Sequence, residues 1–322
     1  MNFVIIGAGA VGGVVGARLQ EAGYAVTFVA RGAHLAAMAA DGLRVESPAG
    51  TATLDVRATD DLRTVDWTAG PVALVAVKSQ QLPAVLTDLA SAAPPETPVV
   101  CLQNGVANEP AALRLFSRVY GVNVNCPATF LEPGVVQAWS TPVTGLLDIG
   151  RYPGGVDDVA RDVAAAFRAS TFDAYAVEDI MRWKHRKLLT NLRNAVDAAC
   201  GPGEQNAELA ARALTEGEAV LTAAARCFAS RDEDRTRRAD LLELGDIDGR
   251  IRGGSSTWQS LQRATGDAEA DYLNGEIVLL GRLHGVPTPA NAALQHVTRQ
   301  LAVDHRPPGS IPAADILAQL HG

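Results

Sequence analysis

A glycine-rich turn close to the N-terminus constrains the fold of this 322-residue chain more than any other feature. The hexapeptide Gly7–Gly12 (GAGAVG) follows the apolar run Phe3–Ile6 and opens a helical pattern that continues to Ala22. A G-x-G-x-x-G pattern is a weak signal alone, but between a strand and a helix it is typical of dinucleotide-binding βαβ units. There the first glycine turns the chain, the second lets a pyrophosphate approach the backbone, and the third lets helix and strand pack closely. We therefore predict a dinucleotide site whose cofactor contacts include Gly7, Gly9, Ala10 and Gly12.

The end of the second strand indicates which dinucleotide is bound. Tyr24–Ala30 has the apolar pattern of a strand, and Arg31 follows it where NAD enzymes carry an acidic residue. A guanidinium at this place suits the 2'-phosphate of NADP. Lys78 adds a second cation after the apolar run Val72–Val77, although a lysine that only terminates a surface strand is an equally good interpretation. We predict NADP (NADPH) as the cofactor, with Arg31 and Lys78 among its contacts.

The N-terminal half has the pattern of a parallel α/β sheet. A helical stretch at Leu82–Ala90 precedes a buried-strand pattern at Val99–Leu102, as expected when crossover helices cover such a sheet. Shorter strands around a helix near residues 157–169 are expected to extend the edge of the sheet; these are Val135–Ala138, Leu146–Ile149 and Phe172–Val177.

Strand patterns cease after Val177, and the rest of the chain is predicted to be helical. Helices are expected at 179–199, 206–229, 256–263, 267–284 and 289–303, and the charge-rich stretch Arg231–Arg238 is expected to be a solvated helix end or loop. The predicted fold class is an α/β Rossmann-type dinucleotide-binding domain (1–177) followed by an all-α domain (178–322).

Composition disfavours several classes of partner. Lys and Arg number 28 against 36 Asp and Glu, and the net charge of −8 is the wrong sign for binding a nucleic-acid backbone. The four cysteines lack C-x-x-C spacing and the six histidines lack ligand spacing, so neither a metal site nor a disulfide framework is expected. Charges or prolines interrupt every apolar run before it reaches the roughly 20 residues that span a bilayer. We expect a soluble, cytoplasmic protein without nucleic-acid or membrane partners.

Chemistry is indicated by a lysine on the first predicted helix of the C-terminal half. Trp183, Lys187 and Asn191 follow one another at i, i+4 steps, and Lys187 lies close to the apolar face of that helix. A lysine that extends from the edge of an apolar stripe into water is the more frequent case. The functional alternative is an ammonium that polarises a carbonyl and supplies its proton when a hydride arrives.

Three further segments carry polar groups that suit the same chemistry. A helical pattern places Glu269, Tyr272, Leu273 and Glu276 on one face, and the pattern alone does not choose between its two carboxylates. Ser256 and Gln259 have the spacing of a capping box, and a helix N-terminus with a hydroxyl also suits a substrate carboxylate. Asn104-Gly105 follows the strand Val99–Leu102, where a simple turn is the alternative. With metal and covalent catalysis disfavoured, hydride transfer remains.

Taken together, these residues resemble the ketopantoate reductase family over essentially the whole chain. The glycine turn, Arg31, Lys78, Asn104-Gly105 and the later segments occur in the order of the family. The resemblance implies that Lys187 is the general acid and that Glu269 binds the substrate hydroxyl beside the carbonyl.

The remaining polar residues receive their roles from the same resemblance. Ser256 is implied to contact the substrate carboxylate, Asn104 and Asn191 to line the substrate cleft, and Asn104 also to meet the cofactor. The family often has a second asparagine eight residues after the lysine, whereas this chain has Ala195 beside Asn194, so the substrate-facing asparagine is left open. One extra residue separates Ser256 from Glu269, and Thr257–Ser260 (TWQS) departs from the family pattern.

The leading hypothesis is reduction of 2-dehydropantoate to pantoate with NADPH. Reduction of another 2-keto acid, carbonyl or imine within the same fold is the alternative, because the departures from the family pattern fall near the substrate. A non-catalytic NADP(H) sensor is a hypothesis of a different class, but a sensor does not need a lysine, a carboxylate and a serine in one site. A homodimer is expected from the helical second domain.

Overall fold

The computed structural model describes residues 1–263, 266 and 268–320. Its contacts divide the chain into two compact units that are interleaved in sequence. The first unit comprises residues 1–103, 108–181 and 232–252, and the second comprises 104–107, 182–231 and 253–322. The expected boundary at 177/178 is a single cut, whereas the chain passes between these units five times.

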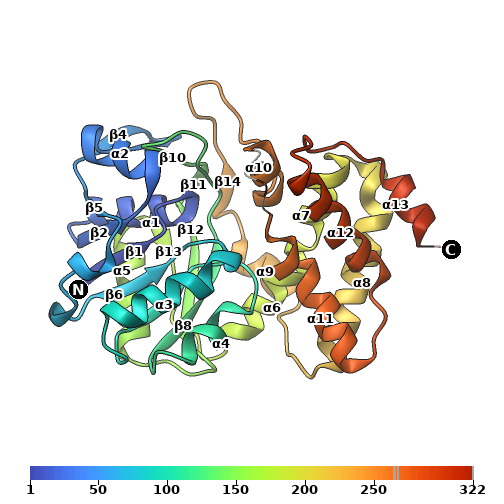
Figure 1. Ribbon diagram of the computed structural model, residues 1–322, viewed down its shortest axis with the longest axis horizontal. Coiled ribbons are helices and arrows are strands. Elements are labelled where there is room, and N and C mark those ends of the chain that lie inside the picture. Colours follow the sequence, from blue (N-terminus) through green and yellow to red (C-terminus); the bar gives the residue numbers. More distant parts are fainter. Residues whose placement is uncertain (264–265, 267, 321–322) are drawn as a thin grey trace. The chain divides into compact units, whose positions relative to one another are not determined.

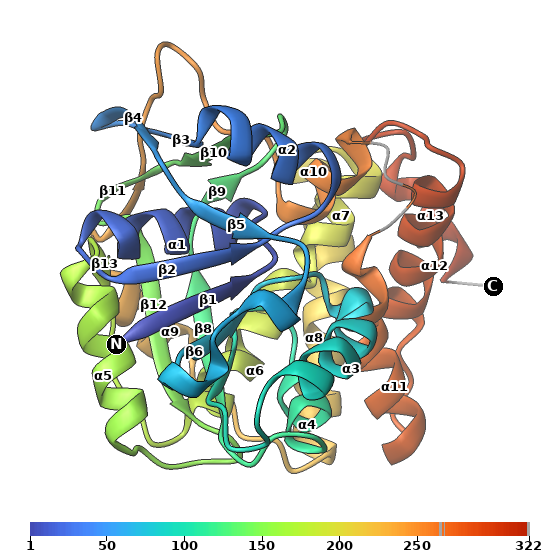
Figure 2. The same cartoon turned by 60° about the vertical axis from the view of Figure 1, so that its left-hand side comes forward.

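An eight-stranded sheet forms the centre of the first unit. Its strand order is β13-β12-β8-β7-β6-β1-β2-β5, and its pairs are parallel except that β12 runs antiparallel to β8 (Figures 1 and 2). The strands are β1 (Asn2–Ile6), β2 (Ala25–Val29), β5 (Arg57–Thr59), β6 (Val72–Val75), β7 (Val99–Cys101), β8 (Val119–Asn125), β12 (Gly145–Arg151) and β13 (Phe172–Asp173).

Both faces of this sheet are buried, which explains the continuous apolar runs in its strands. Phe3 and Ile5 of β1 join one core, while Val4 and Ile6 join the other. The first core also contains α1 (Ala10–Glu21), α2 (Gly32–Asp41) and α5 (Asp158–Ala169). The second core contains α3 (Leu82–Ala92) and α4 (Asn108–Leu113) together with the short 3₁₀ helices η1 (Leu62–Thr64) and η2 (Trp67–Ala69).

Two smaller sheets complete the first unit. One has the order β4-β3-β10-β9, and the other pairs β11 with β14. Their strands are β3 (Leu43–Ser47), β4 (Gly50–Leu54), β9 (Ala128–Thr129), β10 (Val135–Ala138), β11 (Ser140–Pro142) and β14 (Leu242–Leu244). Two expectations were therefore wrong: β10 pairs with β3 instead of extending the main sheet, and a strand does occur after residue 178.

The segment 232–252 is fixed to the first unit by buried charges. Arg237, on α9 (Arg231–Arg238), donates Nη2–H to Asp148 at 2.7 Å and Nη1–H to Asp173 at 2.8 Å. Arg250 donates to Glu46 at 2.7 Å. The stretch that the sequence indicated to be a solvated helix end or loop is therefore a helix, and one of its arginines forms a largely buried ion pair.

The second unit is helical. It contains α6 (Ile180–Asn191), α7 (Arg193–Cys200), η4 (Glu204–Asn206), α8 (Ala207–Ala223), α10 (Ser256–Gln262), η5 (Glu269–Tyr272), α11 (Asn274–His284), α12 (Pro289–Val303) and α13 (Ala313–Gln319). The predicted fold class, an α/β Rossmann-type domain with an all-α domain, is confirmed.

Several predicted helices differ in extent from the observed ones. The helix expected at 179–199 is interrupted at Leu192, and α8 ends six residues early because Ala225 adopts a positive φ of 52°. In the segment expected to be helical over 267–284, residue 267 lies outside the described residues, and the remainder is a 3₁₀ turn and a helix separated at Leu273, whose φ and ψ are −115° and −86°.

Candidate active site

The turn between β1 and α1 has the geometry that a bound pyrophosphate requires. Gly7 has a φ of +97°, and a Cβ there would lie 2.7 Å from Cγ1 of Val77, so only glycine fits. A Cβ on Gly12 would collide with the carbonyl oxygen of Gly7. At Gly9 a Cβ would meet no described atom within 4 Å, which leaves the backbone open to a ligand. No described side chain caps α1, so the amide donors of its first turn face this opening.

His34 holds this turn in place from the second helix. Its Nε2 lies 2.8 Å from the carbonyl oxygen of Ala8, and its Nδ1 accepts a hydrogen bond from the backbone N–H of Gly134 at 2.9 Å. Because Nδ1 accepts, Nε2 carries the proton and the imidazole is neutral. Burial lowers the pKa of His34, although its bond to Ala8 opposes that shift. Sequence reasoning missed this residue because nothing in its spacing distinguishes it from an ordinary helical histidine.

Acidic pH is expected to weaken the folded state through His34. In the unfolded chain His34 titrates near 6.5, whereas burial lowers its pKa in the folded chain. Below pH 6.5 His34 binds a proton in the unfolded state but stays neutral in the folded state. The free energy of unfolding therefore falls, by at most about 1.4 kcal/mol per pH unit, until the folded pKa is reached. Urea unfolding at pH 7.5 and 5.5 should show a smaller loss for His34→Gln than for the unchanged protein. Equal losses in the two proteins would contradict this role.

The two predicted cations follow β2 and β6 by two and three residues. Arg31 is the extended residue before α2, and its side chain is 69% exposed. Its Nη2 lies 3.3 Å from Oδ2 of Asp88 on α3. Lys78 does not end its strand as expected, because β6 stops at Val75; it precedes the 3₁₀ turn η3 (Ser79–Gln81), and its backbone N–H donates to Gln81 Oε1 at 3.3 Å.

Helix α6 carries the predicted general acid. Lys187 is half-buried, and Asn191 follows it one helical turn later with only 5% of its surface exposed. The Nδ2 of Asn191 makes no hydrogen bond with any described residue. A buried amide donor without an acceptor destabilises a protein, so such a group indicates a ligand or water that completes it.

The sequence contains three lysines among its 28 basic residues, namely Lys78, Lys184 and Lys187. Arginine thus supplies nearly all the positive charge of this chain. An arginine keeps its proton at any pH at which proteins fold, whereas a lysine can release one. The scarcity of lysines in this chain is a compositional signal that singles out Lys187 as a candidate for proton transfer.

Two hydrogen bonds link the junction of α6 and α7 to the segments that carry Ser256 and Glu269. Ser255 donates its hydroxyl hydrogen to the carbonyl of Asn194 at 3.4 Å, which fixes the start of α10 and therefore Ser256. Asn274 donates from Nδ2 to the carbonyl of Leu192 at 3.3 Å, which fixes the chain just after η5. These bonds tie both segments to the helix pair that carries Lys187 and Asn191.

Two details of these segments correct the sequence analysis. The residue that caps α10 is Ser255, whose Oγ accepts from the N–H of Trp258 at 3.3 Å, so Ser256 is the first helical residue and is free of the capping role. Glu269 and Glu276 do not share one helical face, because the chain breaks at Leu273 between them. Asn274, the residue after the break, is buried and donates both to the carbonyl of Leu192 and, at 3.0 Å, to Oδ1 of Asn291 on α12.

The two carboxylates have different surroundings. Glu269 lies in η5 and is 7% exposed, whereas Glu276 is half-buried on α11. Burial raises the pKa of Glu276, against a smaller effect of Arg226 that lowers it.

The predicted site residues divide between the two units. Asn104, two residues after the predicted strand Val99–Leu102, belongs to the second unit. The same unit contains Lys187, Asn191, Ser256 and Glu269. The structure therefore assigns these five predicted residues to one unit, and the glycine turn, Arg31 and Lys78 to the other.

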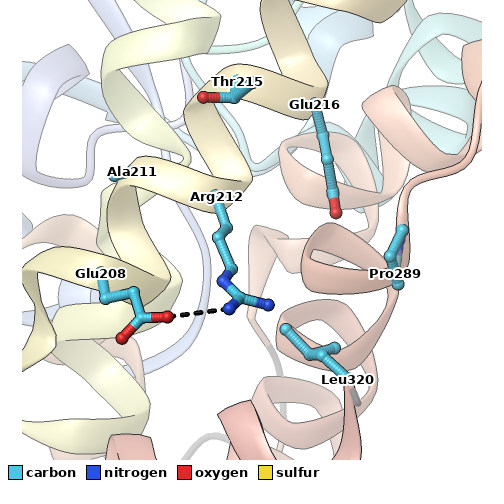
Figure 3. Close-up of a pocket in the computed structure, with 7 residues that line it drawn as sticks. All are labelled: Glu208, Ala211, Arg212, Thr215, Glu216, Pro289 and Leu320. Atoms are coloured by element: carbon cyan, nitrogen blue, oxygen red, sulfur yellow. Dashed lines mark hydrogen bonds and ion pairs between the residues drawn. The ribbon is translucent and has the colours of Figure 1, made fainter. Parts of the chain in front are cut away.

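A separate hollow of about 470 Å³ opens in the second unit (Figure 3). Arg212 extends across it and donates from Nη2 to Oε1 of Glu208 at 2.8 Å. Glu216, on the same helix, points toward Pro289. Glu216 caps α12, since its carboxylate accepts from the N–H groups of Ala290 and Asn291. None of the described lining residues belongs to the predicted site.

Within the described residues, no helix is both long and apolar enough to cross a bilayer.

Comparison with known proteins identifies the family. The family described as Ketopantoate reductase PanE/ApbA matches residues 3–154, and its C-terminal part matches residues 179–302. The chain belongs to the ketopantoate reductase family. A relative from Archaeoglobus fulgidus, a 2-dehydropantoate 2-reductase, is 33% identical over 305 residues, which cover 92% of this chain and 96% of the relative.

Solved structures agree with this family assignment. A ketopantoate reductase from Ralstonia eutropha has a TM-score of 0.78 and 28% identity, with 95% of this chain and all of that chain covered. A D-mandelate dehydrogenase solved with NADH and anilino(oxo)acetate has a TM-score of 0.79 at 21% identity, covers 95% of this chain and 99% of its own, and shows the shared fold. As a member of the ketopantoate reductase family, this chain is an oxidoreductase that acts on a CH–OH/C=O pair of a keto acid with a nicotinamide dinucleotide.

Proposed function

We propose that this chain reduces 2-dehydropantoate to pantoate with NADPH. The observation that carries the proposal is the pair on α6: a half-buried lysine and, one turn later, a buried asparagine whose amide donor lacks a partner among the described residues. Such a pair suits a substrate oxygen that gains negative charge during the reaction. When bound, NADPH supplies the hydride that reduces the keto carbon to CH–OH.

The residues of the first unit fit this cofactor. The open backbone at Gly9 and the first turn of α1, including Ala10, would receive the pyrophosphate. Arg31 and Lys78 would hold the 2'-phosphate, since both are cations that follow strands of the parallel sheet. In this proposal residues 1–177 form the cofactor domain together with the segment 232–252 that packs on them, and the rest of residues 178–322 forms the substrate domain.

The residues of the second unit would bind and protonate the substrate. Lys187 polarises the keto oxygen and donates its proton to it, so that the product leaves as a hydroxy acid. Asn191 completes its hydrogen bonds on the substrate, and Glu269 binds the hydroxyl beside the carbonyl. Ser256, which is free of the capping role, contacts the substrate carboxylate, and Asn104 contributes a further polar contact.

The substrate assignment is tested by following NADPH oxidation with a panel of 2-keto acids that includes 2-dehydropantoate. The proposal expects kcat/KM to be highest for 2-dehydropantoate. A higher kcat/KM for another 2-keto acid would support the reductase activity but identify that acid as the substrate instead of 2-dehydropantoate. NADPH binding without turnover of any keto acid, carbonyl or imine would instead indicate a sensor.

Replacing Arg31 with alanine is expected to remove most of a preference for NADPH over NADH of about tenfold or more. A charge-assisted contact to the 2'-phosphate contributes on the order of 1.5 kcal/mol, which corresponds to about tenfold in affinity. The check is kcat/KM for both cofactors in the unchanged protein and in Arg31→Ala. Arg44→Ala, another exposed arginine of the first unit, is the control and should keep the preference. Equal efficiency of the unchanged protein with both cofactors would rule out this role of Arg31.

A further inference from the structure

The arginine at the end of β2 already has an acidic partner. Nη2 of Arg31 lies 3.3 Å from Oδ2 of Asp88, and the two side chains are 69% and 56% exposed. Asp88 belongs to α3, on the opposite core of the sheet from α2, which follows Arg31. The pair therefore joins two elements that are 57 positions apart in sequence, at the place where the second strand ends.

A second pair of the same kind lies within electrostatic reach. Arg63 donates Nε–H and Nη2–H to the two carboxylate oxygens of Asp61, each at 2.9 Å. Asp61 caps η1, two residues after β5, the neighbour of β2 in the sheet. The charge of Asp88 acts on Arg63 as well as on Arg31. These two arginines and two aspartates carry no net charge, so this edge attracts a phosphate less than its arginines alone would.

Asp88 is not needed for the fold of α3. The buried residues of that helix are Leu82, Val85, Leu86 and Leu89, whereas the side chain of Asp88 is more than half exposed. An exposed ion pair contributes little to stability, typically 0 to about 1 kcal/mol. Asparagine at this position would keep the size of the side chain and remove only its charge.

We propose that Asp88 sets the cofactor selectivity of this protein by competing with the 2'-phosphate for Arg31. This inference rests on the proposed role of Arg31 as a 2'-phosphate contact. A phosphate monoester carries a charge of about −1.5 to −2 at pH 7. It has to displace the carboxylate of Asp88 from the guanidinium and then remain close to that negative charge. NADH has a hydroxyl at this place, so Asp88 penalises NADPH and leaves NADH unaffected.

The experiment compares Asp88→Asn with the control Asp162→Asn. Asp162 is an exposed aspartate of α5, which packs on β12 and β13, and four strands separate β12 from β2 in the sheet. Both variants change the net charge equally. Titration calorimetry would give the Kd of NADPH and of NADH for each protein at about 20 mM and about 300 mM salt.

For Asp88→Asn we expect the Kd of NADPH to fall by about three- to tenfold at low salt, with the gain shrinking at high salt. The Kd of NADH should stay within about twofold, as should both values for Asp162→Asn. When Asp88→Asn is combined with Arg31→Ala, the gain in NADPH affinity should be smaller, because the contact between Arg31 and the 2'-phosphate for which Asp88 competes is then absent. No change in NADPH affinity, an equal gain for both cofactors or an equal gain in the control would overturn the inference.

Arg31→Ala alone separates this inference from the proposed function. If that variant keeps the NADPH preference, the assigned 2'-phosphate contact is wrong and Asp88 loses its role with it. If Arg31→Ala loses the preference while Asp88→Asn binds NADPH unchanged, only the competition by Asp88 is refuted.

Discussion

Replacing Lys187 with alanine is expected to lower kcat by about 100- to 10,000-fold, which is the usual contribution of a positioned general acid. Hydride arrival at the keto carbon places negative charge on the oxygen, and Lys187→Ala removes the group assigned to protonate that oxygen. The Kd of NADPH should change by less than about threefold, because the assigned cofactor contacts other than Asn104 lie in the first unit. Steady-state kinetics with 2-dehydropantoate and fluorescence titration with NADPH provide the two measurements.

Two companion variants make this result specific. Lys187→Arg keeps the positive charge but holds its proton too firmly to donate it, so we expect kcat to stay at least about tenfold below that of the unchanged protein. Glu269→Ala should mainly raise KM for the keto acid, because Glu269 is assigned to binding. A kcat within a few-fold of normal in Lys187→Ala would exclude Lys187 as the acid.

Replacing Arg237 with alanine is expected to reduce the free energy of unfolding by about 3–5 kcal/mol. Arg237 pairs with Asp148, whose side chain is 2% exposed, and with Asp173, whose side chain is 19% exposed. Its guanidinium also lies 4.9 Å from the ring centroid of Tyr175. Removal of the arginine leaves a buried carboxylate without its counter-charge, and that desolvated charge is the main source of the loss.

The matched control is Arg235→Ala, two residues earlier on the same helix. Arg235 pairs with Asp232 at 2.9 Å, but the two side chains are 81% and 82% exposed. An exposed pair of this kind contributes at most about 1 kcal/mol. Urea unfolding followed by circular dichroism measures both variants. Similar losses for Arg235→Ala and Arg237→Ala would show that the buried pair is not what fixes α9.

The parts of the fold that the sequence predicts are those whose signals are local. β1, α1 and β2 follow from a glycine turn between an apolar run and a helical period, and the observed bounds lie within one residue of the predicted ones. The strands before Arg31 and Lys78 were found because parallel strands buried on both faces appear as continuous apolar runs, although β6 ends at Val75, two residues before the predicted end. The family resemblance then ordered the later segments.

The parts that the sequence did not predict depend on distant partners. β11 and β14 are three residues each, and they pair across about a hundred positions, from Ser140 opposite Leu244 to Pro142 opposite Leu242. Short polar strands lack a period that a sequence window detects. The burial of Arg237 was not predicted either, because its partners Asp148 and Asp173 lie on the distant strands β12 and β13. A charged stretch has the same sequence pattern whether or not one of its charges is buried.

Within the candidate site, sequence reasoning found the helix of Lys187 but not what fixes its surroundings. Asn274 occurs in the middle of a helical pattern, and its hydrogen bonds to Leu192 and Asn291 depend on three helices packing together. The cap of α10 was misplaced by one residue, because Ser256 has Gln259 at capping-box spacing, whereas Ser255, the observed cap, has Trp258 there. That shift matters, because it leaves the hydroxyl of Ser256 free for the assigned substrate contact.

The interleaving of the two units limits how this protein can be divided. A fragment that ends at residue 181 lacks β14, so β11 would lose its pairing strand, and it lacks Arg237, so Asp148 would stay buried and charged without a counter-ion. A fragment that includes all of the first unit has to extend to Arg252, and it then carries α7 and α8 without the later helices α10, α11 and α12 against which they pack. The cofactor half of this enzyme is therefore not a transferable module: grafting it onto another substrate domain requires moving residues 232–252 together with it.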